Sequence, residues 1–164
     1  VLQWMGEEGL GDWDRRRLDV HRDQWHAELR AAGVPEGDSE AALRRVMSAL
    51  GNVLDDRKAA WILQRDHEAA NNELKITAYR DGRLQNLVID RTFIDANGVR
   101  WIIDYKTSSH EGGGRELFLD REVERYRAQL ETYAEALGAD EARPIRLGLY
   151  FPLLSGWREW DYRA

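Results

Sequence analysis

Two strand-like segments on either side of an Asn-Gly turn constrain the fold of this chain more than any other feature. Residues 87–95 and 99–107 are rich in β-branched and aromatic side chains, and Asn97-Gly98 lies between them. An Asn-Gly dipeptide between two such segments is typical of a β-hairpin. The sequence therefore predicts two antiparallel strands joined at this turn.

The conformation of the turn decides which residues of the two strands face each other. If Gly98 takes the left-handed conformation that closes a three-residue loop, Asp95 pairs with Val99. This register places Asp90 opposite Asp104, with Cβ atoms about 5 Å apart on one face of the sheet. Two like charges this close repel each other, so a fold that keeps them needs a cation between them.

A shorter loop would give a different result. A two-residue Asn97-Gly98 turn would pair Arg91 with Asp104 and send Asp90 to the other face of the sheet. That arrangement would be a salt-bridged pair with no catalytic interest. We prefer the three-residue loop, because Asp95-Ala96-Asn97-Gly98 suits a type I turn followed by a left-handed glycine.

Lys106 completes a reactive group, because it follows Asp104 by two residues and points to the same face. Carboxylate oxygens bind Mg²⁺ or Mn²⁺, and a lysine beside them can position a nucleophile and stabilise charge on a phosphate. Asp90, Asp104 and Lys106 therefore suit metal-assisted phosphodiester hydrolysis. They could instead be solvated strand residues, since Asp-x-Lys is common by chance. The flanking Ile89 and Ile102 oppose that alternative, because charges within apolar strands need partners.

A predicted helix carries polar and aromatic residues along one face. Tyr126, Gln129 and Tyr133 lie at positions i, i+3 and i+7 of a helix expected over 118–137. Their amide and hydroxyl groups need polar partners, which a phosphate or a hydrated metal ion would supply. The same pattern also fits an amphipathic helix with two aromatic residues in the core. Glu73 begins another expected strand, where it either provides a further carboxylate to the metal or ends a loop.

The order of the expected elements indicates the fold class. Residues 1–60 have helical periodicity, and from Trp61 the pattern changes to strands. One strand is expected at 73–79, ahead of the hairpin, and two more at 145–154 and 157–162, after the long helix. This order favours an α/β or α+β fold with a mixed sheet flanked by helices and an N-terminal helical segment.

Some elements have recognisable ends. One helix is expected from Val20 to Ala32, ended by Gly33-Val34-Pro35, and Asp38-Ser39 are expected to cap the next. Arg80-Asp81-Gly82-Arg83 predicts a turn, and Glu111-Gly112-Gly113-Gly114 predicts a flexible loop. The four histidines, His21, His26, His67 and His110, are expected at the surface.

Composition limits the class of protein. The 164 residues suffice for one domain, divided into an N-terminal helical segment over 1–60 and a core over 61–164. The absence of cysteine excludes disulfides, cysteine zinc sites and cysteine-ligated iron–sulfur clusters, and it is compatible with the cytoplasm. No apolar run reaches the length of a membrane span. A net charge of −6 weighs mildly against nucleic-acid binding, although charge can be segregated on the surface.

These motifs together resemble the RecB-like branch of the PD-(D/E)xK nuclease superfamily. More narrowly, they resemble the C-terminal nuclease domain of UvrD-family helicase–nucleases such as RecB and AddA. That pattern contains a glutamate, an Ile-Asp-Arg strand, an Asp-x-Lys strand and a helix with Gln-x-x-x-Tyr. The matching residues here are Glu73, Ile89-Asp90-Arg91, Asp104-Tyr105-Lys106, and Gln129 with Tyr133. Their order and spacing match over residues 70–137, and 149–152 resembles the strand that follows.

The resemblance implies a DNA nuclease that depends on Mg²⁺, or alternatively Mn²⁺, and has no iron–sulfur cluster. It implies that Asp90, Asp104 and the backbone carbonyl of Tyr105 bind the metal. Lys106 would be the catalytic lysine, and Glu73, Gln129 and Tyr133 would complete the site. The implied partners are DNA, helicase domains of the same parent chain and a second helicase–nuclease subunit, in repair and recombination of broken double-stranded DNA. No membrane is expected.

One feature of that family has no counterpart here. Its pattern includes a metal-binding histidine in a Gly-x-x-x-His motif on an N-terminal helix, and nothing in residues 1–26 matches it. Val1-Leu2-Gln3 resembles the residues just after that histidine, so we expect a fragment with a formed but incomplete site and impaired cleavage. Two other classes remain open: a catalytically silent module that binds DNA ends or a repair partner, and a small acidic scaffold domain.

Overall fold

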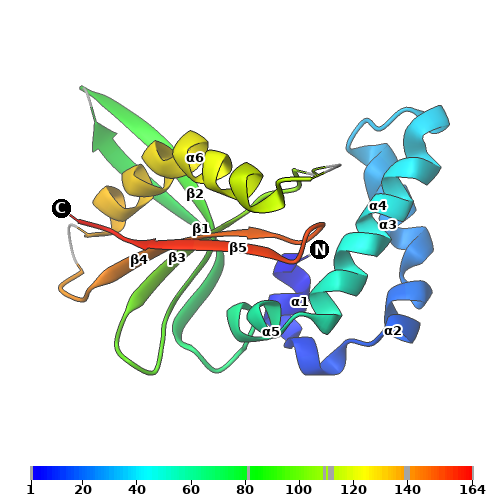
Figure 1. The fold of residues 1–164 in the computed structure, drawn as a ribbon, viewed down its shortest axis with the longest axis horizontal. Coiled ribbons are helices and arrows are strands. Elements are labelled where there is room, and N and C mark those ends of the chain that lie inside the picture. Colours follow the sequence, from blue (N-terminus) through cyan, green and yellow to red (C-terminus); the bar gives the residue numbers. More distant parts are fainter. Residues whose placement is uncertain (1, 81, 109, 111–112, 139–140, 164) are drawn as a thin grey trace.

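A five-stranded sheet lies beside a group of helices in the computed structural model, which describes residues 2–80, 82–108, 110, 113–138 and 141–163 (Figure 1). The described strands are β1 (Glu68–Arg80), β2 (Arg83–Ile94), β3 (Arg100–Tyr105), β4 (Ile145–Phe151) and β5 (Gly156–Asp161). The described helices are α1 (Leu2–Glu8), α2 (Arg15–Val20), α3 (Arg22–Ala31), α4 (Glu36–Asp55), α5 (Arg57–Ile62) and α6 (Arg115–Gly138), with a 3-10 turn at Leu10–Asp12.

The predicted hairpin is present in the predicted register. β2 and β3 are antiparallel, and Phe93 pairs with Trp101. In the same register, the backbone N–H of Asp95 donates a hydrogen bond to the carbonyl of Val99 at 3.0 Å. Gly98 has a φ of 75°, the left-handed conformation that the three-residue loop requires. The alternative two-residue loop is therefore wrong.

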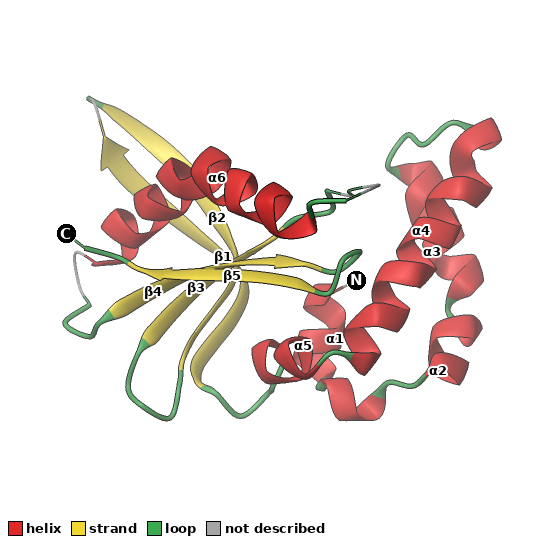
Figure 2. Ribbon diagram, in the orientation of Figure 1, coloured by secondary structure: helices red, strands yellow, loops and turns green. Residues whose placement is uncertain are grey.

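The sheet is mixed, because α6 carries the chain across it. β1, β2 and β3 form an antiparallel meander, β3 and β4 are parallel, and β5 is antiparallel to β4. A parallel pair needs a crossover connection, and α6 supplies it while lying across one face of the sheet (Figure 2). The fold predicted from the order of the elements, a mixed sheet flanked by helices, is confirmed.

Each face of the sheet has its own apolar core. The side chains beneath α6 include Ile89, Ile102, Leu130, Leu147 and Leu149. Those on the opposite face, toward the helical part, include Met5, Ile62, Phe93, Ile103 and Tyr150. Full burial of one such side chain contributes about 1.5–3 kcal/mol. β2 and β3 are therefore held from both sides, which fixes the strand ends that carry the candidate site.

Two helix boundaries in the first segment differ from the predicted ones. The helix expected over 20–32 is interrupted at His21, where α2 ends and α3 begins. α4 begins directly after Pro35, its N-cap, so the predicted cap at Asp38-Ser39 is wrong. Ser39 is buried, and its Oγ lies 2.7 Å from Nε2 of His26. The hydroxyl therefore links α4 to α3 instead of capping a helix.

The change from helix to strand comes later than predicted. Trp61 belongs to α5, whose N-cap Asp56 accepts a hydrogen bond from the backbone N–H of Lys58 at 2.8 Å. The helical segment, expected to end near residue 60, therefore continues to Ile62, because the Asp56 cap starts a further short helix.

The predicted strands are confirmed with some different ends. β1 extends the strand expected over 73–79 in both directions, and β4 is shorter than the expected 145–154. β5 agrees with 157–162 to within a residue at each end. Residues 111–112 of the expected Gly-rich loop and residue 81 of the expected turn lie outside the described residues. Among the helices that the structure describes, none is both long and apolar enough to cross a membrane.

Candidate metal centre

The hairpin brings two aspartates together at the ends of β2 and β3. The paired part of β2 and β3 ends at Arg91 and Ile103, and Asp90 and Asp104 are the next residues along the two strands. Oδ2 of Asp90 accepts a hydrogen bond from the backbone N–H of Tyr105 at 2.8 Å, so the carboxylate links the two strands where their ladder ends. Asp104 is 4% exposed, whereas Asp90 is half-buried. The predicted carboxylate pair is therefore formed on neighbouring strands.

Burial makes both carboxylates costly to ionise. Burial, with a smaller contribution from the charge of Asp104, raises the pKa of Asp90 to about 6 despite the hydrogen bond from Tyr105. Burial also raises the pKa of Asp104, and Lys106 opposes this rise. Two carboxylates that are hard to ionise separately are stabilised by a cation that both contact.

Lys106 lies between the carboxylate pair and α6. Its Nζ is 2.5 Å from Oδ2 of Asp104, 3.8 Å from the ring centre of Tyr126 and 3.4 Å from Oε1 of Gln129. The amide Nε2 of Gln129 donates a hydrogen bond to the hydroxyl of Tyr133 at 2.6 Å. The three residues predicted to share one helix face therefore gather at the lysine and hold it against Asp104.

Glu73 lies on β1 beside Asp90. β1 and β2 keep one register on both sides of Glu73, and that register makes Glu73 the counterpart of Asp90. Glu73 has a φ of 48°, a left-handed conformation that costs a residue with a side chain about 1–2 kcal/mol. Its charge contributes to the raised pKa of Asp90, and its side chain is exposed. Strain of this kind gathers at functional sites, which agrees with a carboxylate at the open edge of the centre.

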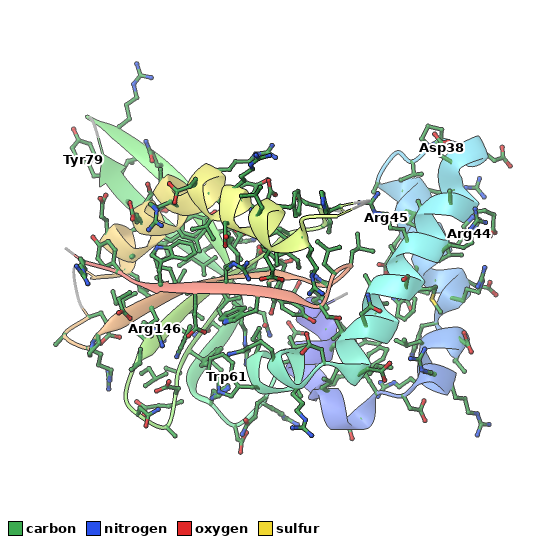
Figure 3. All side chains as sticks on the ribbon, viewed as in Figure 1. Asp38, Arg44, Arg45, Trp61, Tyr79 and Arg146 are labelled. Atoms are coloured by element: carbon green, nitrogen blue, oxygen red, sulfur yellow. The ribbon has the colours of Figure 1, made fainter. Side chains whose placement is uncertain are left out.

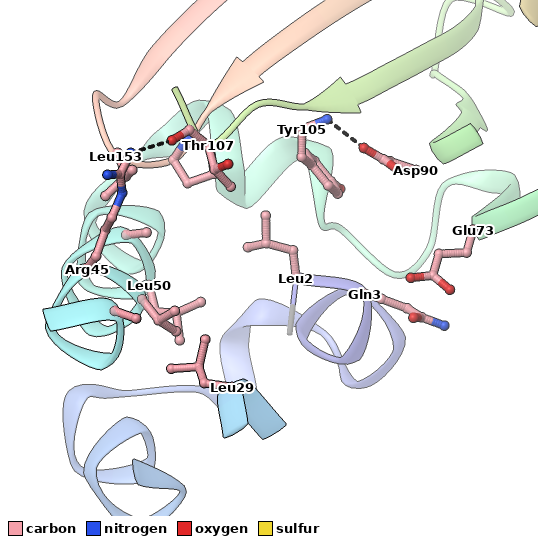
Figure 4. A pocket seen from close by; sticks show the side chains of 14 residues that line it. Leu2, Gln3, Leu29, Arg45, Leu50, Glu73, Asp90, Tyr105, Thr107 and Leu153 are labelled. Atoms are coloured by element: carbon pink, nitrogen blue, oxygen red, sulfur yellow. Dashed lines mark hydrogen bonds between the residues drawn. The ribbon is translucent and has the colours of Figure 1, made fainter. Parts of the chain in front are cut away.

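A pocket of about 450 Å³ opens beside the carboxylates, between the sheet and the helical part (Figure 4). Glu73, Asp90 and Tyr105 line it from the strands, and Leu2 of α1 and Leu50 of α4 are among the residues that line it from the helices. The sequence did not predict this pocket, because its walls come from segments far apart in the chain. It opens a route to Asp90 and Glu73 from the helical side.

The donor set fits a hard divalent cation. Oδ2 of Asp104 is buried, and Nζ of Lys106 lies 2.5 Å from it. Within the part of the chain that the structure describes, no three His, Cys, Asp or Glu side chains are grouped to hold a metal. Mg²⁺ usually binds through one or two carboxylates and keeps several waters. Asp90 and Asp104 would hold it, and the carbonyl of Tyr105 stays a predicted ligand.

Arg91 anchors the strand that carries Asp90. Its side chain is 2% exposed, and its guanidinium donates hydrogen bonds to the carbonyls of Ile62 at 3.0 Å and Gln64 at 2.8 Å. It also donates to Oδ1 of Asn72 at 3.2 Å. A charged residue within an apolar strand was the signal for this role, since such a residue needs several partners when buried.

The prediction that all four histidines lie at the surface is wrong. Each is half-buried and packed against an aromatic ring or hydrogen-bonded. His67 is the clearest case, because its ring stacks on Phe93 with 3.9 Å between centres and its Nε2 lies 2.7 Å from the carbonyl oxygen of Trp61. These partners lie on other elements, so sequence position alone did not reveal them.

Replacing Asp90 with asparagine is expected to stabilise the metal-free protein at pH 8. The folded state retains the Asp90 proton up to a pH of about 6, whereas an ordinary aspartate releases it near 3.8. Ionisation therefore removes stability as the pH rises through this interval. Because water partly screens the half-buried carboxylate, we expect a difference on the order of 1–2 kcal/mol at pH 8 that shrinks toward pH 4. Urea unfolding in EDTA at both pH values measures it.

The exposed Asp66 provides the matched control, and Asp66→Asn should follow the wild-type pH dependence. Mg²⁺ should reverse the order of stability, because the wild type gains binding energy that Asp90→Asn largely loses. An Asp90→Asn protein that is less stable than the wild type in EDTA at pH 8 would contradict the proposed cost of ionising Asp90.

Comparison with known proteins identifies the family of the chain. The family model described as "PD-(D/E)XK nuclease superfamily" matches residues 7–155. A comparison with curated proteins finds no match. A solved structure titled "Crystal structure of SSO0001" is 16% identical with a TM-score of 0.42, and the match covers 90% of this chain. The chain spans 61% of the length of that protein.

Proposed function

The chain belongs to the PD-(D/E)XK nuclease superfamily, and on this basis we propose that it is an Mg²⁺-dependent deoxyribonuclease. The superfamily itself implies a metal-dependent nuclease. The observation that carries the finer proposal is the contact of Lys106 with Asp104 at 2.5 Å, beside Asp90 and beneath Gln129. This arrangement supports the proposal, because a metal ion and a phosphate would need a carboxylate pair and a cationic side chain close together.

Each residue has a distinct task in this proposal. Asp90 and Asp104 hold the cation, with the backbone carbonyl of Tyr105 as a further ligand. The cation would activate a water and offset the charge that develops on the phosphate. Lys106 neutralises charge on the phosphate oxygens from the α6 side, and Glu73 adds a carboxylate at the open edge.

The cellular setting is proposed from the order of the motifs. Glu73, Ile89-Asp90-Arg91, Asp104-Tyr105-Lys106 and Gln129 with Tyr133 follow the pattern of helicase–nucleases of the RecB type. We therefore propose DNA ends as the substrate and helicase domains of the same parent chain as partners. We also propose a second helicase–nuclease subunit as a partner. The proposed cellular role is repair and recombination of double-strand breaks.

Incubation with linear and closed circular duplex DNA in Mg²⁺, Mn²⁺ or EDTA tests the activity. We expect cleavage that requires the divalent ion, and preference for linear DNA would support action at ends. DNA binding without cleavage in either metal would favour a catalytically silent module instead. No change of melting temperature with either metal would contradict the metal centre itself.

Gln129 is expected to be a positioning residue. Gln129→Leu removes the acceptor for Lys106 and the donor to Tyr133, so the lysine loses one of the contacts that hold it. We expect kcat to fall about tenfold, in keeping with the loss of one hydrogen bond to a charged group. The KM for DNA and the melting-temperature shift in Mg²⁺ should stay near those of the wild type.

A matched control lies on α3, where Gln24 donates a hydrogen bond to Glu28 at 3.0 Å, also four residues along a helix. Gln24→Leu should leave kcat unchanged. Equal losses of kcat in the two variants would show that Gln129 acts only through general stability.

A further inference from the structure

The hairpin of β1 and β2 continues well past the metal centre. We name residues 74–88 the hairpin arm. Figure 1 shows the arm projecting beyond α6, and Figure 3 shows Tyr79 near its end. Tyr79 is 75% exposed, Leu84 is 73% exposed and Val88 is 41% exposed. Large apolar side chains this exposed, gathered on one element, usually mark a contact surface.

The two faces of the arm differ. Leu74, Ile76 and Leu87 pack against the core beneath α6. The opposite face, which we name the outer face, carries the three cross-strand pairs Lys75 with Val88, Thr77 with Asn86, and Tyr79 with Leu84. The arm adjoins the centre on both strands, because it begins directly after Glu73 on β1 and ends two residues before Asp90 on β2. The outer face therefore leads from the metal centre to the tip of the arm.

The charge of the arm is opposite to that of the whole chain. The arm contains Lys75, Arg80 and Arg83 and one acidic residue, Asp81, whereas the chain has a net charge of −6. Within the described residues, neither Lys75 nor Arg83 forms an ion pair, and both are exposed. A basic element on an acidic protein complements a polyanion better than it complements a second copy of the chain.

The middle of the outer face offers polar groups. Oγ1 of Thr77 donates a hydrogen bond to Oδ1 of Asn86 at 3.0 Å, which fixes the orientation of that amide across the two strands. Asn86 therefore lies with a fixed amide between the cross-strand pairs of Tyr79 and Lys75. Amide, ammonium and apolar groups of this kind can contact the edges of DNA bases.

We propose that the outer face of the hairpin arm lies in a groove of the duplex DNA whose backbone reaches the metal centre. The major groove is wide enough for a two-stranded β-ribbon. Leu84 is six residues from Asp90 along β2, which corresponds to about 20 Å of strand and about six base pairs of duplex. The arm thus contacts DNA about six base pairs from the cleaved phosphate. This inference rests on the proposed DNA nuclease function.

DNA binding in EDTA tests the arm separately from catalysis. Fluorescence anisotropy with a labelled 24-base-pair duplex should show that the double variant Tyr79→Ser, Leu84→Ser binds about tenfold more weakly or worse than the wild type. Arg83→Gln should lower the slope of log K against log salt concentration by about 1, because one phosphate contact is lost. The Tyr79 and Leu84 substitutions should leave that slope unchanged.

Two comparisons make the test specific. The control Val20→Ser removes an apolar side chain that is 71% exposed on α2, and it should bind the duplex like the wild type. A DNA hairpin with a four-base-pair stem is too short to span the centre and the arm. The difference between the wild type and the double variant should vanish on this probe.

Several results would overturn the proposal. One is that the double variant binds the duplex as tightly as the wild type. Another is that the double variant loses as much affinity for the four-base-pair stem, or for a single strand of 24 nucleotides, as it loses for the duplex. A change of oligomeric state by light scattering with unchanged DNA binding would assign the outer face to a contact between copies. If the wild type cleaves DNA with Mg²⁺ but the arm variants bind normally, only the arm proposal fails. If the wild type neither binds nor cleaves DNA, the proposed function fails as well.

Discussion

Asp104→Asn is expected to abolish cleavage of DNA. Asp104 is 4% exposed, and its buried Oδ2 lies 2.5 Å from Nζ of Lys106. The substitution keeps the shape of the side chain but removes the charge that would hold a cation. We expect kcat/KM to fall by at least about 10³-fold, because the metal supplies several kcal/mol of stabilisation to the transition state. The rise of melting temperature in Mg²⁺ should disappear in the same variant.

Asp95 on the same hairpin is the matched control. Its carboxylate accepts hydrogen bonds from the indole N–H of Trp101 at 2.9 Å and from the backbone N–H groups of Asn97 and Val99 at 2.8 Å and 3.1 Å. Asp95→Asn should therefore cost about 1 kcal/mol of stability and leave the metal response intact. Cleavage by Asp104→Asn at the wild-type rate, or a loss of cleavage in Asp95→Asn alone, would refute the assigned centre.

The hairpin could be predicted from the sequence, because short-range rules fix it. The turn at Asn97-Gly98 needs a left-handed glycine, and Gly98 adopts that conformation. The two-residue alternation of a strand then places Asp90 on the rung of Asp104 without any knowledge of the core. The register of β2 and β3 agrees with this prediction as far as the pair of Arg91 and Ile103, which adjoins the two aspartates.

The contacts of α6 with the hairpin were predictable only in part. Helical spacing places Tyr126, Gln129 and Tyr133 on one face, and in the structure the first two contact Lys106 while Gln129 donates a hydrogen bond to Tyr133. Spacing does not say which strand residue this face meets. The α6 face contacts Lys106, and this contact depends on how α6 crosses the sheet between β3 and β4.

Other features depend on partners far away in the chain. Arg91 is held by carbonyls near the end of α5, and Ser39 is held by His26 of α3, so neither role follows from local pattern. The left-handed conformation of Glu73 likewise does not follow from its position in the sequence. Burial and strain of this kind arise from tertiary packing, which overrides local propensity.

Lys106→Met is expected to stop cleavage while preserving the metal response, which separates it from Asp104→Asn. The ammonium lies 2.5 Å from Oδ2 of Asp104, so it competes with a cation for that oxygen. Without it, the melting-temperature shift in Mg²⁺ should be retained or enlarged. We expect kcat to fall by at least about 10²-fold, because a preorganised cationic donor aimed at the phosphate is lost. Single-turnover cleavage and thermal denaturation with increasing Mg²⁺ measure the two effects.

Two further substitutions decide whether Lys106 acts on the reaction or only on the fold. Lys106→Arg should not restore the rate, because a planar guanidinium does not reproduce a compact ammonium between Asp104 and the Tyr126 ring. Lys58 also contacts aromatic rings, at 4.7 Å from Trp61 and 4.8 Å from Trp157, but it belongs to α5. Lys58→Met should therefore lower stability and leave kcat unchanged. A Lys106→Met protein that loses both cleavage and the Mg²⁺ shift would reduce the lysine to a structural support of Asp104.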